Sequence, residues 1–485
     1  MAQDSMHLPV WKQPFPEDSE LAAQAEELRR EHLLLDARPP KELADRVLTP
    51  MARLGWVFWL VFVVLAGALL TWLVTWTNQM FQGLGVVGYN RVVMWAPYII
   101  NFVYFIGIGH AGTFISAALR VLRFDWRAPI SRAAETLTIF ALAAAGSMPL
   151  IHLGRAWKAY WLIPYPNERG LWPDLHSPLL WDMIAIFTYL SCSLLFEYLG
   201  LLPDLAMARE YVTGWRKRFY TLLSLGWRGS GKQWKHLDTA QNVFSYAIIP
   251  VMFSVHTIVS WDFAMTLQPE WHSSIFGPYF VVGALFSGVG AVIIVLAVLR
   301  KALHLEYYIR AEHFNGMGKF LLVLSLTWAY FYFNSYIVPW YGQDPASRVI
   351  LQNEATGWAA PLWYLMLFSN IVVPWATLWS KKLRTSIPVI VGVSIFVQIG
   401  MYIERYLIVA MSLGYNYLPF NWLTYTPQLT EILITIGAFS LVTLGVVLTS
   451  RLVPIIPVWE VKEGQRMQGM RRIGRAMVQT RTEPE

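Results

Sequence analysis

Residues 55–77 read GWVFWLVFVVLAGALLTWLVTWT and contain no charged side chain. A helix of about 20 apolar residues crosses the hydrocarbon core of a bilayer. This stretch is too long and too uniformly apolar for an alternating barrel strand, so it predicts a transmembrane helix. Residues 1–50 before it are polar and amphipathic, without the apolar core of a signal peptide. We therefore expect the first hydrophobic run to be a retained span.

Nine further runs of this kind follow along the chain. Of its 485 residues, 56% are hydrophobic and 14% are charged, whereas a soluble domain carries about a quarter charged residues. The sequence therefore predicts an all-α integral membrane protein with ten transmembrane helices. The further runs are 92–119, 131–153, 178–202, 241–266, 275–300, 318–341, 358–380, 386–411 and 425–451.

The loops between these runs alternate in charge. Basic residues gather in every second connection and in the tail after Arg451, while 78–91, 267–274, 342–357 and 412–424 hold very few. We expect the chain to lie in the cytoplasmic membrane. The positive-inside rule then places both termini in the cytoplasm and the loop 154–177 outside the cell. The basic connections hold Arg120, Arg123, Arg127, Arg132, Arg209, Arg216, Lys217, Arg218, Arg228, Lys232, Lys235, Arg300, Lys301, Arg310, Lys381, Lys382 and Arg384.

The single cysteine, Cys192, restricts the chemistry of this chain. One thiol cannot form an internal disulfide, a multi-thiolate zinc site, a covalent haem attachment or an iron–sulfur cluster. We therefore expect no metal or haem here, and place any such centre in a partner. In a membrane protein, the net charge of +7 mainly reflects membrane topology, and we expect no nucleic-acid partner. The stretch 17–46 is expected to form an amphipathic helix, and the basic tail 460–485 to contact anionic lipid or a partner protein.

Several ionisable residues fall at one depth, near the outer boundary. At about 1.5 Å per helical residue, His152, Asp182, Asp262 and the pair Glu404–Arg405 come from four different spans, and Arg155 follows His152 by one turn. They are either interfacial residues that tolerate water or a shared pocket. A pocket with a histidine, carboxylates and an arginine, walled by aromatic residues such as Trp181 and Trp261, suits a quinone, whose oxygens need partners that also take protons.

A second group lies elsewhere in the membrane. His110, Glu135 and Glu197 fall toward the cytoplasmic ends of their spans, and His256 falls in the outer half of its own. They are either satisfied structural pairs or an inner half-channel for protons. As haem ligands, His110 and His256 would fail, because we expect them more than ~15 Å apart along the membrane normal. A secondary transporter is disfavoured because no span carries a paired Gly–Pro interruption at its centre.

Two stretches resemble a known family. GIGHAGTFISAALRVLRFDWRAPISRAAE at 107–135 and MPLIHLGRAWKAYWLIPYPNERGLWPDLHSPLLWD at 148–182 are similar to the NrfD, or polysulfide-reductase, membrane-subunit family. The resemblance covers roughly 50–455 and is strongest to the larger NrfD-type subunit, ActC, of alternative complex III. It implies two four-helix bundles, about 92–266 and 275–411, with the first and last spans flanking them.

The resemblance also implies a function. His152, Asp182, Asp262 and Arg405 match a quinol site at the outer face, against an iron–sulfur subunit, and the quinol would be menaquinol. Further partners would be c-type cytochrome subunits and a second NrfD-like subunit that lacks the quinol site. The expected domains are 1–50, a cytoplasmic segment; 51–91, the first helix and outer loop; 92–266, the first bundle; 267–411, the second bundle; 412–452, the last helix; and 453–485, the tail.

We therefore expect a quinol-oxidising membrane subunit of a respiratory or photosynthetic complex that passes electrons to an extracytoplasmic iron–sulfur subunit. Proton translocation is a further hypothesis, which rests on His110, Glu135, Glu197 and His256. The alternatives are the related subunit without a quinol site and a haem-b membrane cytochrome.

Overall fold

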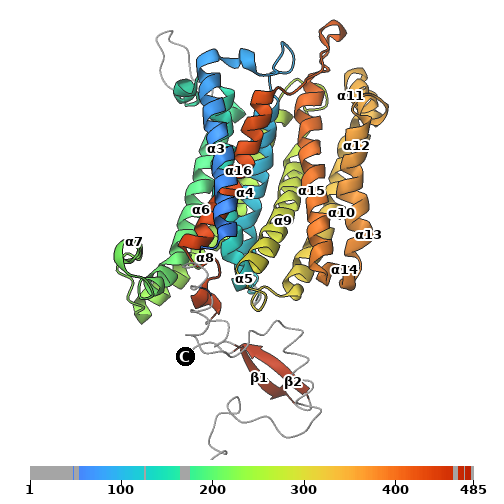
Figure 1. Cartoon of the computed structure of the whole chain (residues 1–485). Helices are drawn as coiled ribbons and strands as arrows, with labels where there is room; N and C mark the ends of the chain where they lie inside the picture. Colours follow the sequence, from blue (N-terminus) through green and yellow to red (C-terminus); the bar gives the residue numbers. More distant parts are fainter. Residues whose placement is uncertain are drawn as a thin grey trace, which may run out of the picture.

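The structure is a computed structural model that describes residue 47 and residues 54–124, 127–163, 175–461, 468–473 and 476–481, the last two by their backbone alone. Ten helices in this part of the chain are long and apolar enough to cross a membrane, so the predicted ten spans are confirmed. Figure 1 shows them side by side in one bundle of nearly parallel rods. The predicted amphipathic helix over 17–46 lies outside the described residues.

The spanning helices run through most of the chain, and several are longer than the hydropathy runs that predicted them. α8 begins ten residues before its predicted start at 241, because Ser230 and Gln233 form a capping box at its first turn. The spans are α3 (Trp56–Gln82), α4 (Pro97–Val121), α5 (Ala128–His152), α6 (Pro178–Ala208), α8 (Gly231–Ala264), α9 (Phe276–Ala302), α10 (Ala311–Gly342), α12–η6–α13 (Ala360–Leu367, Phe368–Val372, Val373–Leu378), α15–η7 (Ile387–Tyr406, Leu407–Met411) and α16 (Leu429–Leu452).

Short elements connect the spans, and one of them was not expected. β1 pairs antiparallel with β2 in the C-terminal tail, whereas the sequence predicted helices alone. The short elements are η3 (Leu84–Val86), η5 (Ala156–Leu162), α7 (Gly214–Leu223), α11 (Pro345–Thr356), α14 (Lys381–Thr385), η8 (Pro419–Asn421), β1 (Gln468–Ile473) and β2 (Ala476–Arg481).

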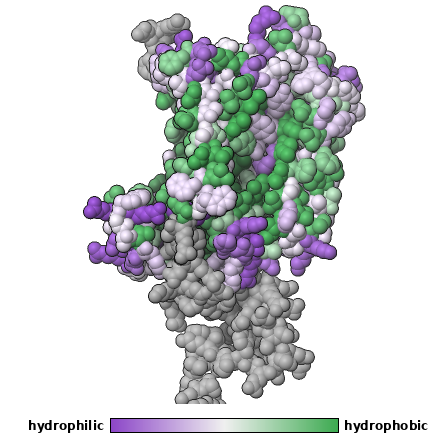
Figure 2. Space-filling model, viewed as in Figure 1, coloured by the Kyte–Doolittle hydropathy of each residue, from purple (hydrophilic) through white to green (hydrophobic). Residues whose placement is uncertain are grey.

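The two ends of the bundle differ, and we name them the α7 end and the α11 end (Figure 1). The end of α16 and α7 lie at the α7 end. The start of α3 lies there too, since the Arg451 guanidinium near the end of α16 is 5.5 Å from the centre of the Phe58 ring. In Figure 2 an apolar band separates the two ends, and hydrophilic residues gather at α7. The apolar band is the surface that would face lipid.

The helices pack in two sets of neighbours. α4 packs on α5 and α8, and α6 packs on α5 and α8, so these four helices form one ring of contacts. α9 packs on α10 and α15, while the interrupted helix α12–η6–α13 contacts both α10 and α15. α9 also packs on α4 and α8, and α3 and α16 lie against each other. Side chains from both sets can therefore meet where α8 and α9 touch.

Two π turns interrupt spans of the second set. The ring of Pro374 replaces an N–H that would bond the Asn370 carbonyl, and the Ser325 hydroxyl donates to that oxygen at 2.5 Å. The second π turn, η7, follows Arg405 closely, and its Ile408 carbonyl accepts the Trp271 indole N–H at 2.8 Å. Single π turns of this kind occur often at functional sites.

Candidate functional site

A pair of buried carboxyl groups lies at the α11 end. Asp182 is the fifth residue of α6 and Asp262 lies two residues before the end of α8. They are 5% and 7% exposed, and their carboxyl groups are direct neighbours. Two carboxyl groups in such contact are not readily ionised together, since two adjacent negative charges away from water repel strongly. The Oδ1 atom of each is buried without a hydrogen-bond partner among the described residues, so both can bind a polar ligand.

His152 is the last residue of α5 and is half-buried at the same end of the bundle. Its Nδ1 lies 3.0 Å from the hydroxyl of Tyr89, which belongs to the loop between α3 and α4. The two rings are 5.6 Å apart. The imidazole is thus held at one nitrogen by a neutral phenol, and its Nε2 is the nitrogen that remains for a ligand.

Glu404 and Arg405 meet near the end of α15. The Arg405 Nη1 lies 3.0 Å from the Glu404 Oε2, and both side chains are almost fully buried. The other Glu404 oxygen accepts the hydroxyl of Tyr279 and, at 2.8 Å, the indole N–H of Trp328. The carboxylate therefore faces the second set of helices, where its charge is held by a cation and two neutral donors.

Aromatic rings connect the arginine to the carboxyl pair. The Arg405 guanidinium lies 4.7 Å from the centre of the Phe280 ring. Phe280 packs on Phe263, the neighbour of Asp262, with ring centres 5.3 Å apart. Trp271 and Trp95 pack on Phe263 at 4.8 and 5.9 Å. These rings form an apolar wall at the α8–α9 contact, with a cation on one side and carboxyl groups near the other.

The aromatic wall differs from the one that the sequence predicted. Trp181 is 42% exposed and donates its indole N–H to the Leu175 carbonyl at 2.9 Å, while Trp261 is 39% exposed. Arg155 is exposed as well. A ligand role for these three residues stays a prediction. Trp95, Trp271 and Phe280 were missed, because nothing in the local sequence says which aromatic residues point inward.

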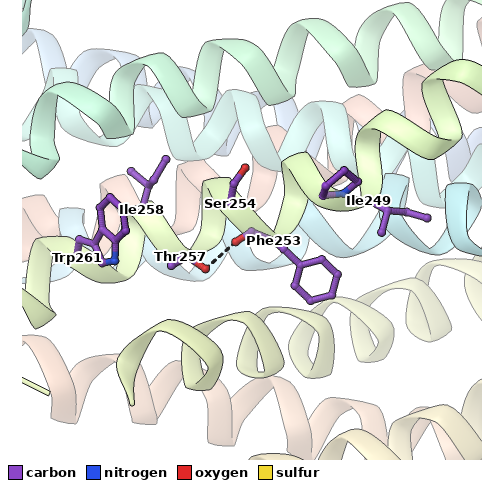
Figure 3. A pocket seen from close by; sticks show the side chains of 7 residues that line it. Ile249, Phe253, Ser254, Thr257, Ile258 and Trp261 are labelled. Atoms are coloured by element: carbon purple, nitrogen blue, oxygen red, sulfur yellow. Dashed lines mark hydrogen bonds between the residues drawn. The ribbon is translucent and has the colours of Figure 1, made fainter. Parts of the chain in front are cut away.

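An apolar groove runs along the outward side of α8. Ile249, Pro250, Phe253 and Trp261 line it together with Ser254, Thr257 and Ile258. Figure 3 shows these side chains on one face of the helix, with the Thr257 hydroxyl bonded to the Phe253 carbonyl. The groove ends at Trp261, the residue directly before Asp262. It therefore ends beside the turn of α8 that carries Asp262.

The sequence-based separation of His110 and His256 is wrong. Their Nδ1 atoms lie 2.8 Å apart, and both side chains are fully buried. The error came from helix ends: α4 begins at Pro97 rather than 92, which moves His110 to the middle of its helix. A directly hydrogen-bonded pair leaves no room for an iron atom between the two nitrogens, which would require about 4 Å. The two histidines are thus unsuited to bind one haem iron because their nitrogens are too close together, and not because they lie at different depths.

Two carboxyl groups lie on the α7 side of this histidine pair. Glu135 accepts a bond from the Ser116 hydroxyl, and Glu197 accepts one from Thr136 at 2.6 Å. Nearby, the Arg132 guanidinium binds Asp204 at 2.5 Å. Glu135 and Glu197 are therefore paired with hydroxyl groups rather than with a cation. Among the described residues, no three His, Cys, Asp or Glu side chains are grouped to hold a metal ion.

A second carboxyl pair was missed by the sequence analysis. Glu270 lies in the loop before α9 and has a positive φ of 70°, and Glu354 lies in α11. Burial raises the pKa of Glu270 to about 8. Burial, and then the neighbouring charge of Glu270, raises the pKa of Glu354 well above its usual range. A hydropathy plot carries no signal for this pair, because the two residues are far apart in sequence.

The structure thus joins some of the predicted residues and separates others. Asp182 meets Asp262, Glu404 meets Arg405, and His110 meets His256, whereas His152 meets Tyr89. The NrfD model of polysulphide reductases matches residues 85–416, more than half of the chain. The chain belongs to this family. All the paired residues named here lie within the matched range.

Two curated proteins are similar to this member of the NrfD family. A putative dimethyl sulfoxide reductase membrane subunit from Halobacterium salinarum is 24% identical over 433 residues, which cover 83% of this chain and 91% of that protein. A selenate reductase subunit from Mesobacillus selenatarsenatis is 22% identical over 236 residues, or 47% of this chain and 54% of that protein. Family and fold together establish a multi-pass membrane protein of the type found in oxidoreductase complexes.

Proposed function

We propose that this chain is the quinol-oxidising membrane subunit of an electron-transfer complex in the cytoplasmic membrane. The observation that carries the proposal is the Asp182–Asp262 pair, which is buried at the α11 end with an unpartnered Oδ1 on each residue among those that the structure describes. Quinol hydroxyl groups need such acceptors, and the apolar ring and tail need walls of the kind that Phe263, Phe280 and the α8 groove provide. His152 and Arg405 complete the site.

The residues divide the work of quinol oxidation, which releases two electrons and two protons. His152 Nε2 accepts one proton and the carboxyl pair accepts the second, because both kinds of group exchange protons near neutral pH when suitably placed. Arg405 stabilises negative charge at the aromatic wall, while Glu404 fixes its guanidinium. The electrons leave for an iron–sulfur subunit that docks on the α11 end, where the loop 154–177 is the expected contact.

The complex is proposed to be of the alternative complex III type, with menaquinol as the substrate. Its further subunits would be c-type cytochromes and a second NrfD-like membrane subunit, and the α11 end would face outward. In this arrangement α4, α5, α6 and α8 are the bundle that holds the quinol site, and α9, α10, α12–α13 and α15 are the second bundle. The two relatives carry reductase names, so an outer-face reductase subunit is the alternative acceptor of the electrons.

Proton transfer across the first bundle is a second proposed function. His110 and His256 lie between the Glu135–Glu197 carboxyl groups and the Asp182–Asp262 pair along the same four helices. Buried ionisable groups in a membrane commonly mark proton routes. Loss of proton movement with retained quinol oxidation in Glu135→Gln and Glu197→Gln vesicles would support it. Unchanged proton movement in both variants would overturn it.

The experiment for the main proposal is quinol oxidation by the assembled complex carrying His152→Ala or Asp182→Asn. We expect turnover to fall by about 10²–10⁴-fold, the range for lost acid–base assistance, while the complex keeps all of its subunits. His236→Ala is the matched control, because His236 is exposed on the same helix as Asp262 but near its other end. Normal turnover in both site variants would remove the site assignment.

A further inference from the structure

Tyr89 is the residue that touches His152, and it comes from outside the four helices proposed to hold the quinol site. It lies in the loop between α3 and α4, which joins a helix that packs on α16 to the start of the bundle. Its hydroxyl is 3.0 Å from the Nδ1 of His152. The geometry of this site therefore depends on the flanking helices.

The flanking helix α16 anchors the loop directly beside Tyr89. The Gly88 N–H donates to the Glu431 Oε2 at 2.9 Å, and the Gln428 N–H donates to the same oxygen at 2.8 Å. Glu431 is fully buried. A Cβ atom at position 88 would overlap the Thr426 carbonyl oxygen, so only glycine lets the loop approach α16 this closely. The backbone next to Tyr89 is thereby fixed.

The end of α5 is fixed from a second direction. The Gln79 side chain of α3 donates its Nε2 hydrogen to the Ile151 carbonyl at 3.0 Å, and it accepts the Tyr98 hydroxyl at 2.6 Å. Gln79 and Tyr98 are both fully buried. Ile151 directly precedes His152, so the backbone that carries the imidazole and the loop that carries Tyr89 are held in one frame.

The bond to Tyr89 has a chemical consequence for the imidazole. A neutral imidazole has one N–H and one free lone pair. When Nδ1–H donates to the Tyr89 oxygen, Nε2 carries the lone pair and can take a proton from a ligand. After that transfer the Nδ1–H bond persists. Burial, followed by the proximity of Tyr98 and Glu431, raises the pKa of Tyr89, so the phenol keeps its own proton throughout.

We propose that Tyr89 is the positioning residue of the quinol site, which fixes the tautomer and orientation of His152 so that Nε2 receives the quinol proton. This inference rests on the proposed function. The groups that face Tyr89 are Tyr98 of α4, Glu431 of α16 and Tyr425 of the loop before α16. The imidazole Nδ1 is bonded to Tyr89 rather than to any of these three.

The test compares Tyr89→Phe with Tyr98→Phe in the assembled complex. Both remove one buried hydroxyl from the same network, but only the first removes the bond to His152. For Tyr89→Phe we expect kcat to fall about 3–10-fold, the value of one hydrogen bond, with KM little changed. The acidic limb of the pH profile should move to lower pH, because the imidazolium loses an acceptor. Tyr98→Phe should lower thermal stability and leave the profile in place.

A second variant guards against misassembly. Replacing Tyr89 by 3-fluorotyrosine changes the strength of the hydrogen bond with almost no change in shape, and should displace the acidic limb as well. If the Tyr89 variants and Tyr98→Phe give identical pH profiles while His152→Ala remains strongly impaired, the positioning inference is overturned. If His152→Ala itself is active, the proposed function falls instead.

Discussion

His110 and His256 hydrogen-bond to each other through their Nδ1 atoms, 2.8 Å apart, at the centre of the first set of helices. The two rings are nearly perpendicular, and Tyr189 packs edge-on to His110 at 4.5 Å while donating its hydroxyl to the His110 carbonyl at 2.7 Å. Both Nε2 atoms are buried without a partner among the described residues. This bond couples α4 to α8 in the interior of the first set.

The stability losses from substituting His110 and His256 should not add. His256→Phe keeps a ring but leaves the His110 Nδ1 unsatisfied, so we expect a loss of about 1–3 kcal/mol in the free energy of unfolding. The double variant with His110→Phe should lose less than the sum, because both partners of the bond are gone. Thermal unfolding of the purified protein measures this, and strictly additive losses would contradict a direct bond.

The effects of substituting Asp182 and Asp262 on quinol oxidation should not multiply. Asp182→Asn and Asp262→Asn each remove one of the two adjacent carboxyl groups, so each is expected to lower quinol oxidation by about 10²-fold. The double variant should be scarcely worse than either single one, because the function of the pair is already lost. Glu306→Gln, at an exposed position of the α7 end, is the control. Independent, multiplying effects would mean that the two carboxyl groups act separately.

Glu270 should make stability depend on pH. Its pKa is about 4.5 in the unfolded chain and about 8 when folded. The contribution of the protonated Glu270 side chain to the free energy of unfolding is therefore present in full below about pH 4.5. It is lost as the pH rises through 8. Glu270→Gln should flatten the fall in melting temperature between pH 5 and pH 9, roughly the interval that brackets the two values. Part of the pH dependence of stability should remain in this variant, because Glu354 is still present. Parallel curves for the variant and the wild type would refute the assignment, and Glu306→Gln should give such parallel curves.

The crossing of α4 and α5 should not tolerate a methyl group at Gly112. A Cβ atom there would overlap the Ala134 carbonyl oxygen and the Thr138 hydroxyl, so Gly112→Ala should cost about 1–3 kcal/mol of stability. Gly67→Ala in α3 is the control, because nothing lies within 4 Å of its added Cβ. The melting temperatures of the two variants provide the comparison. Equal values would show that α4 and α5 can separate without penalty.

The sequence predicted the spans well, because the free energy of placing a residue in lipid is a local property. All ten runs correspond to helices, although several ends differ by up to ten residues. Those ends depend on capping and on proline, as at Ser230 and Pro97, which hydropathy does not register. The error at His110 followed directly, since depth was counted from a helix start that lies five residues too early.

The candidate site divides in the same way between local and non-local information. Sequence alone determined that His152, Asp182, Asp262 and Arg405 occupy helices at membrane depth, because a charged residue within an apolar run is conspicuous. Only the tertiary structure decided which of them meet: Asp182 with Asp262, Arg405 with Glu404, and His152 with Tyr89. The physical reason is that most of these contacts join segments far apart in the chain, and side-chain packing, which hydropathy does not encode, sets the rotation of each helix about its axis.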